Sequence, residues 1–448
     1  MKNKLKILIA AAEITPIAKV GGLGDVIGAL PKALNKLDLD VRLIMPFYSL
    51  IDKDKYKLKP IKQNIKVGGA LINLWQTNLP GSTVPLYLIE HGFFKNKEIY
   101  STALADGPTD IEKFTFFSHA ILESIKTIDF KPNVIHLNDW HTAPVASLIK
   151  TNPFFKSTKT LLTIHNLSNQ GITKTKNHLA EGILNSDLIN TVSPTYAKEI
   201  LTKECGAGLE KILTKKRKQL YGILNGIDTD FFNPQIDKLI KFNYSRESFE
   251  KKTANKTELQ KQLGLPQDKN IALAGLVTRF VWQKGVELIT EKFSTLNCQF
   301  VFLGTGEKKH EDALLNLAKK YPRQFSAQIK FDEQLAHKIY AASDIFLVPS
   351  RFEPCGLTQM IAMRYGSVPL VRATGGLADT VNNKNGFTFK KYSGEELYKT
   401  IDQALTIFYK NKKVWHRLQT NGMRQNFSWE KSAGEYLKLY KKLIFYPH

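Results

Sequence analysis

A segment between Pro349 and Tyr365, PSRFEPCGLTQMIAMRY, combines residue types that could act on a bound ligand. The apolar run Asp344–Val348 before it predicts a buried parallel strand, and Thr358–Tyr365 after it has the composition of a helix. The polar residues in between therefore lie in a strand-to-helix turn, at the sheet edge where open α/β folds bind ligands. These residues are Ser350, Arg351, Glu353 and Cys355.

The second half of this turn suits a phosphate group. Gly356 lets a ligand approach the backbone, and the N–H groups of Gly356, Leu357 and Thr358 open the helix with a partial positive charge. Glu353 is a poor phosphate ligand, so its carboxylate is expected to hold sugar hydroxyls or to face a developing positive charge. The alternative is structural: an ordinary helix cap with a surface glutamate.

Length and composition indicate a globular protein of two domains. The chain has 448 residues, which is too long for one core, and 43% of them are hydrophobic. No apolar run approaches the about 20 residues of a membrane span, and the N-terminus MKNKLKILIAAAE does not resemble a signal peptide. Three cysteines without metal or disulfide spacing complete the expectation of a cytoplasmic protein with no membrane partner.

The formal net charge of +23 raises the question of polyanion binding. The lysines are spread over the whole chain, and no basic run is interleaved with aromatic residues. Most of this charge is therefore interpreted as a solvated surface, and no nucleic-acid partner is expected. A minority of the cations remains available to hold an anionic substrate.

Strands that end in polar residues recur through the first half of the chain. Lys6–Ala12 leads to Glu13 and to a glycine turn, after which Val26–Leu37 is a predicted helix. Asn133–His141 and Thr160–Asn166 are further strands, and residues 60–100 alternate as in a β-hairpin insertion. Repetition of strand, polar tip and helix predicts a doubly wound parallel sheet. The polar groups at its edge are Lys19, Gly21, Gly22, Asp139 and His165.

The same pattern restarts after a polar, turn-rich stretch. We expect an N-terminal domain over residues 1–230, an interdomain connection over 231–264, a second parallel-sheet domain over 265–428 and a C-terminal helix over 429–448. In the second domain Ile271–Arg279 is a strand, a helix is expected from near Val286, and Val368–Val381 contains a strand and a glycine turn. The active site is expected in a cleft between the two sheets.

The strand tips indicate what such a cleft would hold. Arg279, Lys284 and the helix starts at Gly356–Thr358 and Thr374–Leu377 suit a diphosphate, whereas the first domain's tips suit a neutral polyhydroxyl group. Together they describe a nucleotide sugar, with the cations stabilising a leaving diphosphate. The Asp-x-Asp triplets are interpreted as turn residues and His136, Asp139 and His141 as a polar strand edge, so neither a metal nor a cofactor is expected.

The motifs in order resemble bacterial glycogen synthases and plant starch synthases. The resemblance spans nearly the whole chain and rests on the segments AKVGGLGDVIGALPKAL, HLNDWHTA, TIHNLSNQG, TVSPTYAKEI, LNGID, TRFVWQKG, PSRFEPCGLTQM and TGGLADTV. It implies two Rossmann-like domains of the GT-B type, with the C-terminal helix returning to the first. It also implies retaining, front-face transfer of glucose from ADP-glucose to the non-reducing end of an α-1,4-glucan such as glycogen or a maltooligosaccharide.

The resemblance also implies residue roles. Lys19, Gly21 and Gly22 would face the donor, with Asp139 near the sugar and His165 bonded to the glucose hydroxymethyl group. Arg279 and Lys284 would clamp the diphosphate, and Glu353 would contact the glucose. The remaining substrate-binding residues are Asn225, Cys355, Gly356, Leu357, Thr358, Thr374 and Gly375.

Two departures from the family pattern leave alternatives open. Val20 replaces a threonine, and GITKTKNHLAEGI, residues 171–183, closes a stretch that is longer in the family, with Ala180 where a lysine is usual. One alternative is a related glycosyltransferase with altered donor or acceptor. Another is a non-catalytic glucan- or nucleotide-binding relative, which the presence of Lys19, His165, Arg279, Lys284 and Glu353 disfavours.

Overall fold

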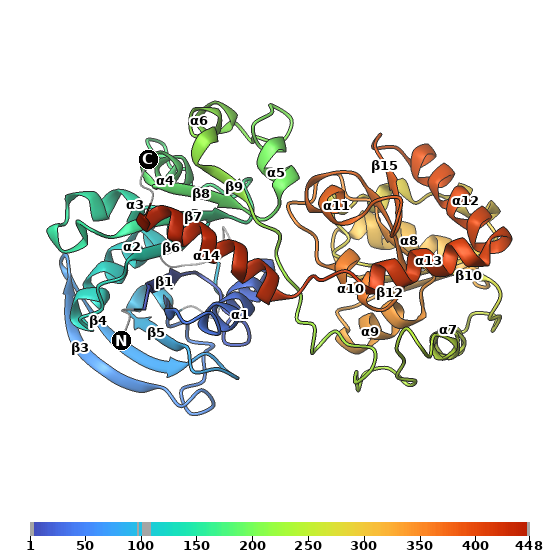
Figure 1. Ribbon diagram of the computed structural model, residues 1–448, viewed down its shortest axis with the longest axis horizontal. Helices are drawn as coiled ribbons and strands as arrows, with labels where there is room; N and C mark the ends of the chain where they lie inside the picture. Colours follow the sequence, from blue (N-terminus) through green and yellow to red (C-terminus); the bar gives the residue numbers. More distant parts are fainter. Residues whose placement is uncertain (1–3, 96–97, 101–108, 446–448) are drawn as a thin grey trace. The chain divides into compact units, whose positions relative to one another are not determined.

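The computed structural model describes residues 4–95, 98–100 and 109–445. The chain forms two compact units (Figure 1). Unit 1 comprises Met1–Gly226 and Trp429–His448, and unit 2 comprises Ile227–Ser428. Each unit has its own parallel sheet and its own hydrophobic core. The two parallel-sheet domains expected from the sequence are confirmed.

Nine strands of the described residues form the sheet of unit 1, in the order β3-β4-β5-β2-β1-β6-β7-β8-β9. The pairs from β5 to β9 are parallel, whereas β3 pairs antiparallel with β4 and β4 with β5, as the alternating pattern predicted. The strands are β1 Lys6–Ala10, β2 Asp40–Pro46, β3 Lys59–Val67, β4 Ala70–Asn78, β5 Pro85–Glu90, β6 Val134–Asn138, β7 Lys159–Ile164, β8 Leu188–Thr191 and β9 Leu220–Gly222.

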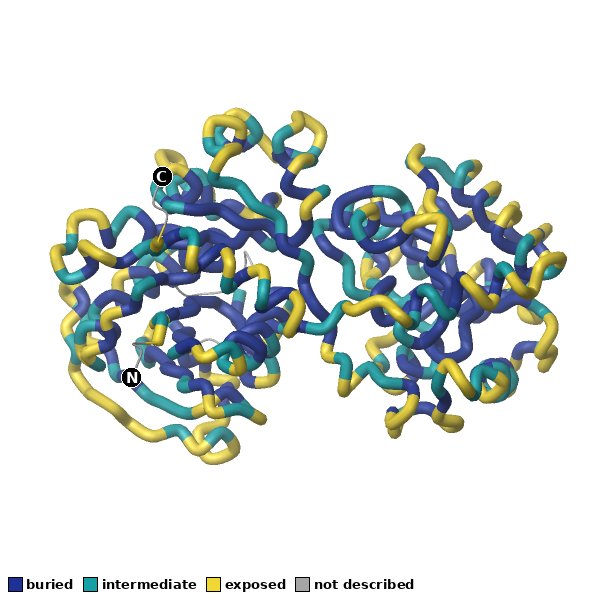
Figure 2. The backbone as a smooth tube through the Cα atoms, in the orientation of Figure 1, coloured by how far each residue is buried: buried dark blue, intermediate teal, exposed yellow. Residues whose placement is uncertain are grey.

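Helices cover this sheet, and burial follows the layers. The central strands β1, β6 and β7 are buried almost throughout, whereas β3 at the edge is exposed along most of its length (Figure 2). Parallel strands covered on both faces need continuous apolar runs, which explains the sequences KILIA and VIHLN. The helices of unit 1 are α1 Gly22–Asn35, α2 Asp110–Thr127, α3 Val145–Leu148, α4 His178–Asn185, α5 Pro194–Glu199, α6 Glu210–Lys215 and α14 Trp429–Phe445.

Helix α14 returns to unit 1 and packs beside α1 and the central strands (Figure 1). The Tyr440 hydroxyl lies 2.8 Å from Nδ1 of His136 inside β6, and Asn190 of β8 donates to the Tyr436 hydroxyl over 3.0 Å. The second ring nitrogen of His136 lies 2.7 Å from the Thr163 hydroxyl, so both nitrogens are occupied within the unit, away from the strand tip where a ligand would bind. Residues 446–448, the end of the predicted C-terminal helix, lie outside the described residues.

The sheet of unit 2 contains six strands of the described chain, all parallel, in the order β12-β11-β10-β13-β14-β15. The strands are β10 Ala272–Val277, β11 Cys298–Gly304, β12 Phe325–Ile329, β13 Ile345–Val348, β14 Val368–Arg372 and β15 Phe387–Phe389. The helices are α7 Glu250–Gln262, α8 Lys308–Lys320, α9 Glu333–Ala342, α10 Thr358–Arg364, α11 Gly375–Thr380, α12 Gly394–Lys410 and α13 Lys412–Met423.

Two expectations about unit 2 need correction. The helix expected from Val286 is only a 3-10 turn, η6 Val286–Leu288, because Gly285 before it is left-handed and Ile289 after it is extended. Residues 231–264 are not a separate connection between domains, since they belong to unit 2 and include α7.

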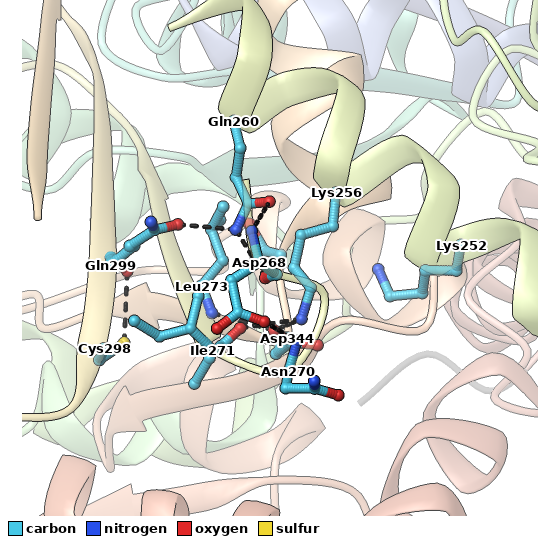
Figure 3. Close-up of polar contacts among 12 residues, drawn as sticks. Lys252, Lys256, Gln260, Asp268, Asn270, Ile271, Leu273, Cys298, Gln299 and Asp344 are labelled. Carbon is cyan, nitrogen blue, oxygen red and sulfur yellow. Dashed lines mark hydrogen bonds and ion pairs between the residues drawn. The ribbon is translucent and has the colours of Figure 1, made fainter. Parts of the chain in front are cut away.

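Helix α7 is attached to unit 2 mainly by buried polar side chains (Figure 3). Lys256 Nζ lies 2.8 Å from Asp344 Oδ2 and donates to the carbonyl of Ile271 over 2.9 Å. Lys252 Nζ donates to the Ala341 carbonyl at the end of α9 over 2.8 Å, and burial lowers the pKa of Lys252 to about 7. Gln260 bonds to Gln299 of β11 over 2.8 Å. These bonds hold the amino ends of β10 and β13.

Candidate active site

The strand order places a ligand-binding edge in each sheet. In unit 2 the chain runs from β10 outward to β12 and then restarts at β13 on the other side of β10. In unit 1 the corresponding reversal is between β1 and β6. Ligands of open α/β sheets bind at the carboxyl ends of the strands at such a reversal. The loops that follow β1, β6, β10 and β13 carry most of the residues predicted from the sequence.

Glu13 organises the glycine loop that follows β1. Its buried carboxylate accepts hydrogen bonds from the N–H groups of Val20 at 2.6 Å and Gly21 at 2.7 Å, and the Tyr100 hydroxyl donates to its second oxygen. Helix α1 begins at Gly22, four residues before the predicted start. The Glu13 carboxylate lies next to this positive end of the helix and stabilises it. Glu13 could not be assigned a role from the sequence, because one acidic residue after a strand carries no distinguishing pattern.

Lys19 lies on this loop and is partly exposed. Its Nζ is 2.6 Å from Asp25 Oδ1, in the first turn of α1. The Gly21 N–H is used by Glu13, which makes Gly21 a structural position as well as a predicted donor contact. Lys19 therefore has a protein partner that a bound anion would have to replace or share.

Asp139, at the tip of β6, shapes the loop that carries His165. Its Oδ1 accepts the backbone N–H groups of His165 at 2.7 Å and Asn166 at 3.3 Å, and its own backbone is left-handed with a φ of 55°. Burial raises the pKa of Asp139 to about 7, although the two backbone donors act in the opposite direction. Asp139 therefore positions His165 from the neighbouring strand.

Asn138 determines which nitrogen of His165 carries the proton. The Asn138 amide nitrogen donates to the carbonyl of Ala10 over 3.0 Å, so its Oδ1 is the atom that faces His165 Nε2, 2.9 Å away. His165 must then donate from Nε2, which leaves Nδ1 as an acceptor for a hydroxyl group. Burial lowers the pKa of His165 to about 3, so the ring is neutral near pH 7.

Burial of three histidines predicts that unit 1 loses stability in mild acid. Burial lowers the pKa of His136, His141 and His165 to about 3 each, below the unfolded value of about 6.5. Between these values the unfolded chain binds more protons, so stability falls as the pH falls. Asp139 acts in the opposite direction. Because its pKa is raised, the folded chain binds about one proton more than the unfolded chain at this residue below pH 7.

The net expectation is a decrease of about 2 kcal/mol in the free energy of unfolding of unit 1 from pH 6 to pH 5. Urea titrations at both pH values, in which unfolding is monitored by hydrogen exchange in β6 and β7, measure this decrease. The His165→Asn variant, which cannot titrate, should show a smaller decrease. Equal stability at the two pH values would contradict the buried, neutral state of these rings.

The shortened segment 171–183 forms a tight connection into α4. Gly171 has a φ of 62°, and a Cβ on it would lie 2.2 Å from the Trp140 ring. Ile172 and Asn177 form an isolated antiparallel bridge, after which the Asn177 side chain accepts the N–H of Ala180 as a helix cap. Ala180 is thus in the first turn of α4. Asn225 is buried, and its Oδ1 has no hydrogen-bond partner within the described residues.

An ion pair connects the two loops at the reversal in unit 2. Lys284 Nζ, in the 3-10 turn η5 Trp282–Lys284, lies 2.6 Å from Glu353 Oε2, and the Ser350 hydroxyl donates to the same oxygen over 3.0 Å. Glu353 is buried and Lys284 is 18% exposed. Glu353 is therefore a buried, paired carboxylate and not the surface residue of the structural alternative.

The glycine turn after β14 packs directly on the Glu353 backbone. A Cβ on Gly375, which has a φ of 45°, would lie 1.9 Å from the Glu353 carbonyl oxygen. The Gly376 N–H donates to the same carbonyl over 3.1 Å. This contact brings the starts of the short helices α10 and α11 together. It gathers the buried residues Cys355, Thr374 and Gly375 with the half-buried residues Gly356, Leu357 and Thr358.

Arg279 differs from Lys284 in its surroundings. It follows β10, is exposed, and its guanidinium has no hydrogen bond or ion pair to any residue that the structure describes. A cation without a protein partner at the carboxyl edge is available to an anionic ligand. The loop after β13 also holds Arg351, which pairs instead with Glu287 over 3.2 Å.

Phe331 is a further residue at this edge that the sequence analysis missed. It follows β12, and 92% of its side chain is exposed. β12 is two strands from β10, so at the usual strand spacing the two tips are about 10 Å apart. An isolated aromatic residue in a loop carries no sequence signal, and only its exposure distinguishes it.

Across the described part of the chain, no group of three or more His, Cys, Asp or Glu side chains could hold a metal ion. Asp52 and Asp228, the first residues of two Asp-x-Asp triplets, accept backbone N–H groups of their own turns. The helices in the same ranges are all too short or too polar to span a bilayer.

The two halves of the chain match two family models. Residues 6–215 match the starch synthase catalytic domain, and residues 255–422 match the glycosyl transferases group 1. The chain is 43% identical to a glycogen synthase of Thermosipho melanesiensis over 483 residues, covering 98% of this chain and 99% of that protein. It is 42% identical to a glycogen synthase of Thermotoga maritima over 486 residues, with the same coverage.

Solved structures agree with these matches. The catalytic domain of starch synthase IV from Arabidopsis thaliana, bound to ADP and acarbose, superimposes with a TM-score of 0.88 at 34% identity, covering 99% of this chain and all of that one. A glycosyltransferase from Rickettsia africae, 18% identical with a TM-score of 0.64, shares the fold.

The two parallel sheets and these matches define a glycosyltransferase of the GT-B class. The chain belongs to the glycogen synthase and starch synthase family. The predicted enzyme class and the glycogen synthase function are confirmed. The alignments with the two bacterial relatives are longer than this chain, which agrees with a shortened segment in it.

Proposed function

We propose that the enzyme transfers glucose from ADP-glucose to the non-reducing end of an α-1,4-glucan, with retention and without a metal ion. The observation that carries this proposal is the pairing of Lys284 with Glu353 at the reversal in unit 2, together with Arg279, whose guanidinium has no partner among the described residues. Two cations at one strand edge suit a diphosphate. Charge that develops on the leaving diphosphate is then stabilised by groups that are already in place.

Glu353 and Lys284 act as one unit in this proposal. Lys284 is paired with the buried Glu353 carboxylate, so its ammonium is held in position before the donor binds. The second oxygen of Glu353 takes a glucose hydroxyl. The N–H groups around Gly356 and Gly375 add donors to the phosphate or the sugar, and Cys355 lines the site without acting as a nucleophile.

His165 is proposed to accept a hydrogen bond from the glucose hydroxymethyl group. Its Nδ1 is the free acceptor because Asn138 fixes the proton on Nε2. A neutral ring can accept this bond near pH 7. Lys19 and Gly22 complete the donor contacts of unit 1, and the buried Asn225 Oδ1 gains a partner when a substrate hydroxyl or amine reaches it.

Phe331 is proposed to stack on the nucleobase of the donor. The tip of β12 is about 10 Å from the cations after β10, a distance that the ribose bridges. Phe331→Ala should raise the Kd for ADP by about tenfold, since stacking of one base on an aromatic ring contributes about 1–3 kcal/mol. Calorimetry with ADP measures it, and Phe331→Tyr should bind normally. An unchanged Kd in the alanine variant would remove Phe331 from the site.

The acceptor is proposed to be a glucan, because the Arabidopsis relative was solved with ADP and acarbose. The shortened segment 171–183 alters the surface on the acceptor side of the family pattern. Calorimetry with ADP, UDP and GDP tests the donor, and mass spectrometry of extended maltoheptaose tests the acceptor. Tighter binding of ADP and addition of single glucose units are expected. Preference for UDP, or no extension, would contradict the proposal.

A further inference from the structure

A group of lysines surrounds a hollow at the edge of the unit 1 sheet where the strands β7 and β8 begin. The hollow has a volume of about 200 Å³ and is lined by Lys150, Lys159, Lys216 and Lys442, which we call the lysine pocket. Lys159 begins β7, and Leu188, which also lines the hollow, begins β8. The pocket is therefore at the amino ends of the strands, whereas His165 follows the carboxyl end of β7.

The four lysines come from four different elements. Lys150 is in the 3-10 turn η2 Ile149–Thr151, Lys159 in β7, Lys216 at the end of α6 and Lys442 in α14. Lys216 also belongs to the run Lys215-Lys216-Arg217-Lys218, a basic stretch that the glycosyltransferase function does not use. Convergence of charge from distant parts of the chain onto one hollow distinguishes the pocket from a solvated lysine surface.

The positive charge of the pocket is only partly balanced. Asp187 is the only carboxylate among its described lining residues, 3.6 Å from Lys159 Nζ, and its other oxygen accepts the N–H and hydroxyl of Thr160. Lys150 bonds to the amide oxygen of Asn185, and Lys442 to the hydroxyl of Tyr221. Burial and the charge of Lys150 lower the pKa of Lys216. An anion in the hollow would relieve this repulsion.

We propose that the lysine pocket binds a diphosphate group. Four ammonium groups against one carboxylate leave about three positive charges, which match a diphosphate better than a single phosphate. A hollow of about 200 Å³ is large enough to admit a diphosphate group. An adjoining hollow of about 590 Å³, which shares Lys150, Lys159, Asn185 and Asp187, leaves space for the rest of an esterified diphosphate.

Calorimetry of the full chain with inorganic pyrophosphate tests this site, with saturating ADP present so that the donor site is filled. Pyrophosphate should still bind, and orthophosphate should bind about tenfold more weakly. The Lys150→Gln/Lys216→Gln variant should lose affinity for pyrophosphate by about tenfold or more. The matched variant Lys211→Gln/Lys413→Gln removes two exposed lysines outside the pocket and should bind normally.

Other outcomes overturn the proposal. Equal pyrophosphate affinity in the two double variants would assign binding elsewhere, and complete competition by ADP would assign it to the donor site. Stronger binding of a DNA duplex or of anionic phosphatidylserine vesicles, lost in the same pocket variant, would make the lysines part of a macromolecular surface. Methyl diphosphate distinguishes an esterified ligand from free pyrophosphate. Binding as tight as that of pyrophosphate supports a diphosphate ester as the ligand, and weaker binding supports the free anion. None of these binding measurements depends on glucosyl transfer.

Discussion

Replacing Lys284 with alanine should lower kcat/KM for glucosyl transfer by about 10²–10³-fold, the usual effect of removing one preorganised charge from a transition state. The ammonium is held 2.6 Å from Glu353 before any donor arrives, so its loss cannot be compensated by solvent at the same position. Initial rates with varied donor and a fixed glucan measure the effect. The decrease should be mainly in kcat, because the charge on the diphosphate increases as the glycosidic bond breaks.

A second variant separates catalysis from folding. Lys284→Ala leaves Glu353 buried with Ser350 as its remaining polar partner, which should cost about 1–3 kcal/mol of stability. Adding Glu353→Gln removes the unpaired charge, so the double variant should recover stability and stay inactive. Recovery of turnover together with stability would show that the pair is structural. Near-normal turnover in Lys284→Ala alone would exclude its role toward the diphosphate.

Replacing Lys256 with methionine should destabilise unit 2 by about 3–5 kcal/mol, because it leaves the buried Asp344 carboxylate without its cation. Lys256 also bonds to the carbonyl of Ile271 at the start of β10, so two strands lose their anchor to α7 (Figure 3). Hydrogen exchange of peptides that cover β10 and β13 measures the local loss. Urea denaturation of the full chain gives the free energy of unfolding.

Lys261 on the same helix provides the matched control. It is exposed, and Lys261→Met should change stability by less than about 0.5 kcal/mol. Adding Asp344→Asn to Lys256→Met should restore part of the loss, since the amide oxygen can still accept the N–H of Leu273. Equal stability of the Lys256 and Lys261 variants would mean that α7 does not depend on this cluster.

The strands and their polar tips could be predicted from sequence because two features coincide there. A buried parallel strand needs a continuous apolar run, and the polar residue after it reports the sheet edge. This logic places His165, Asp139, Arg279 and Glu353 on loops at the carboxyl edges of their sheets, where the structure has them. The expected donor, acceptor and residue roles came from the motif resemblance, because the spacing of the polar residues does not identify them.

The missed features depend on contacts that a linear pattern does not contain. The packing of α7 on unit 2 was missed because this helix buries mainly lysines and amides, so its sequence lacks an apolar face. Glu13 acts through backbone N–H groups of a loop seven and eight residues away, and Phe331 is distinguished only by exposure. The early start of α1 at Gly22 has a similar cause, since Glu13 stabilises a helix start that glycines alone would disfavour.

The proposed synthase activity is measured by transfer of radiolabelled glucose from ADP-glucose into glycogen and into maltooligosaccharides, with UDP-glucose in parallel. Incorporation from ADP-glucose into both acceptors is expected, in α-1,4 linkage and with retention. Extension of the oligosaccharides alone would assign polymer binding to the region that segment 171–183 lacks. Absence of transfer from ADP-glucose to either acceptor, by protein that binds ADP, would contradict the proposed activity.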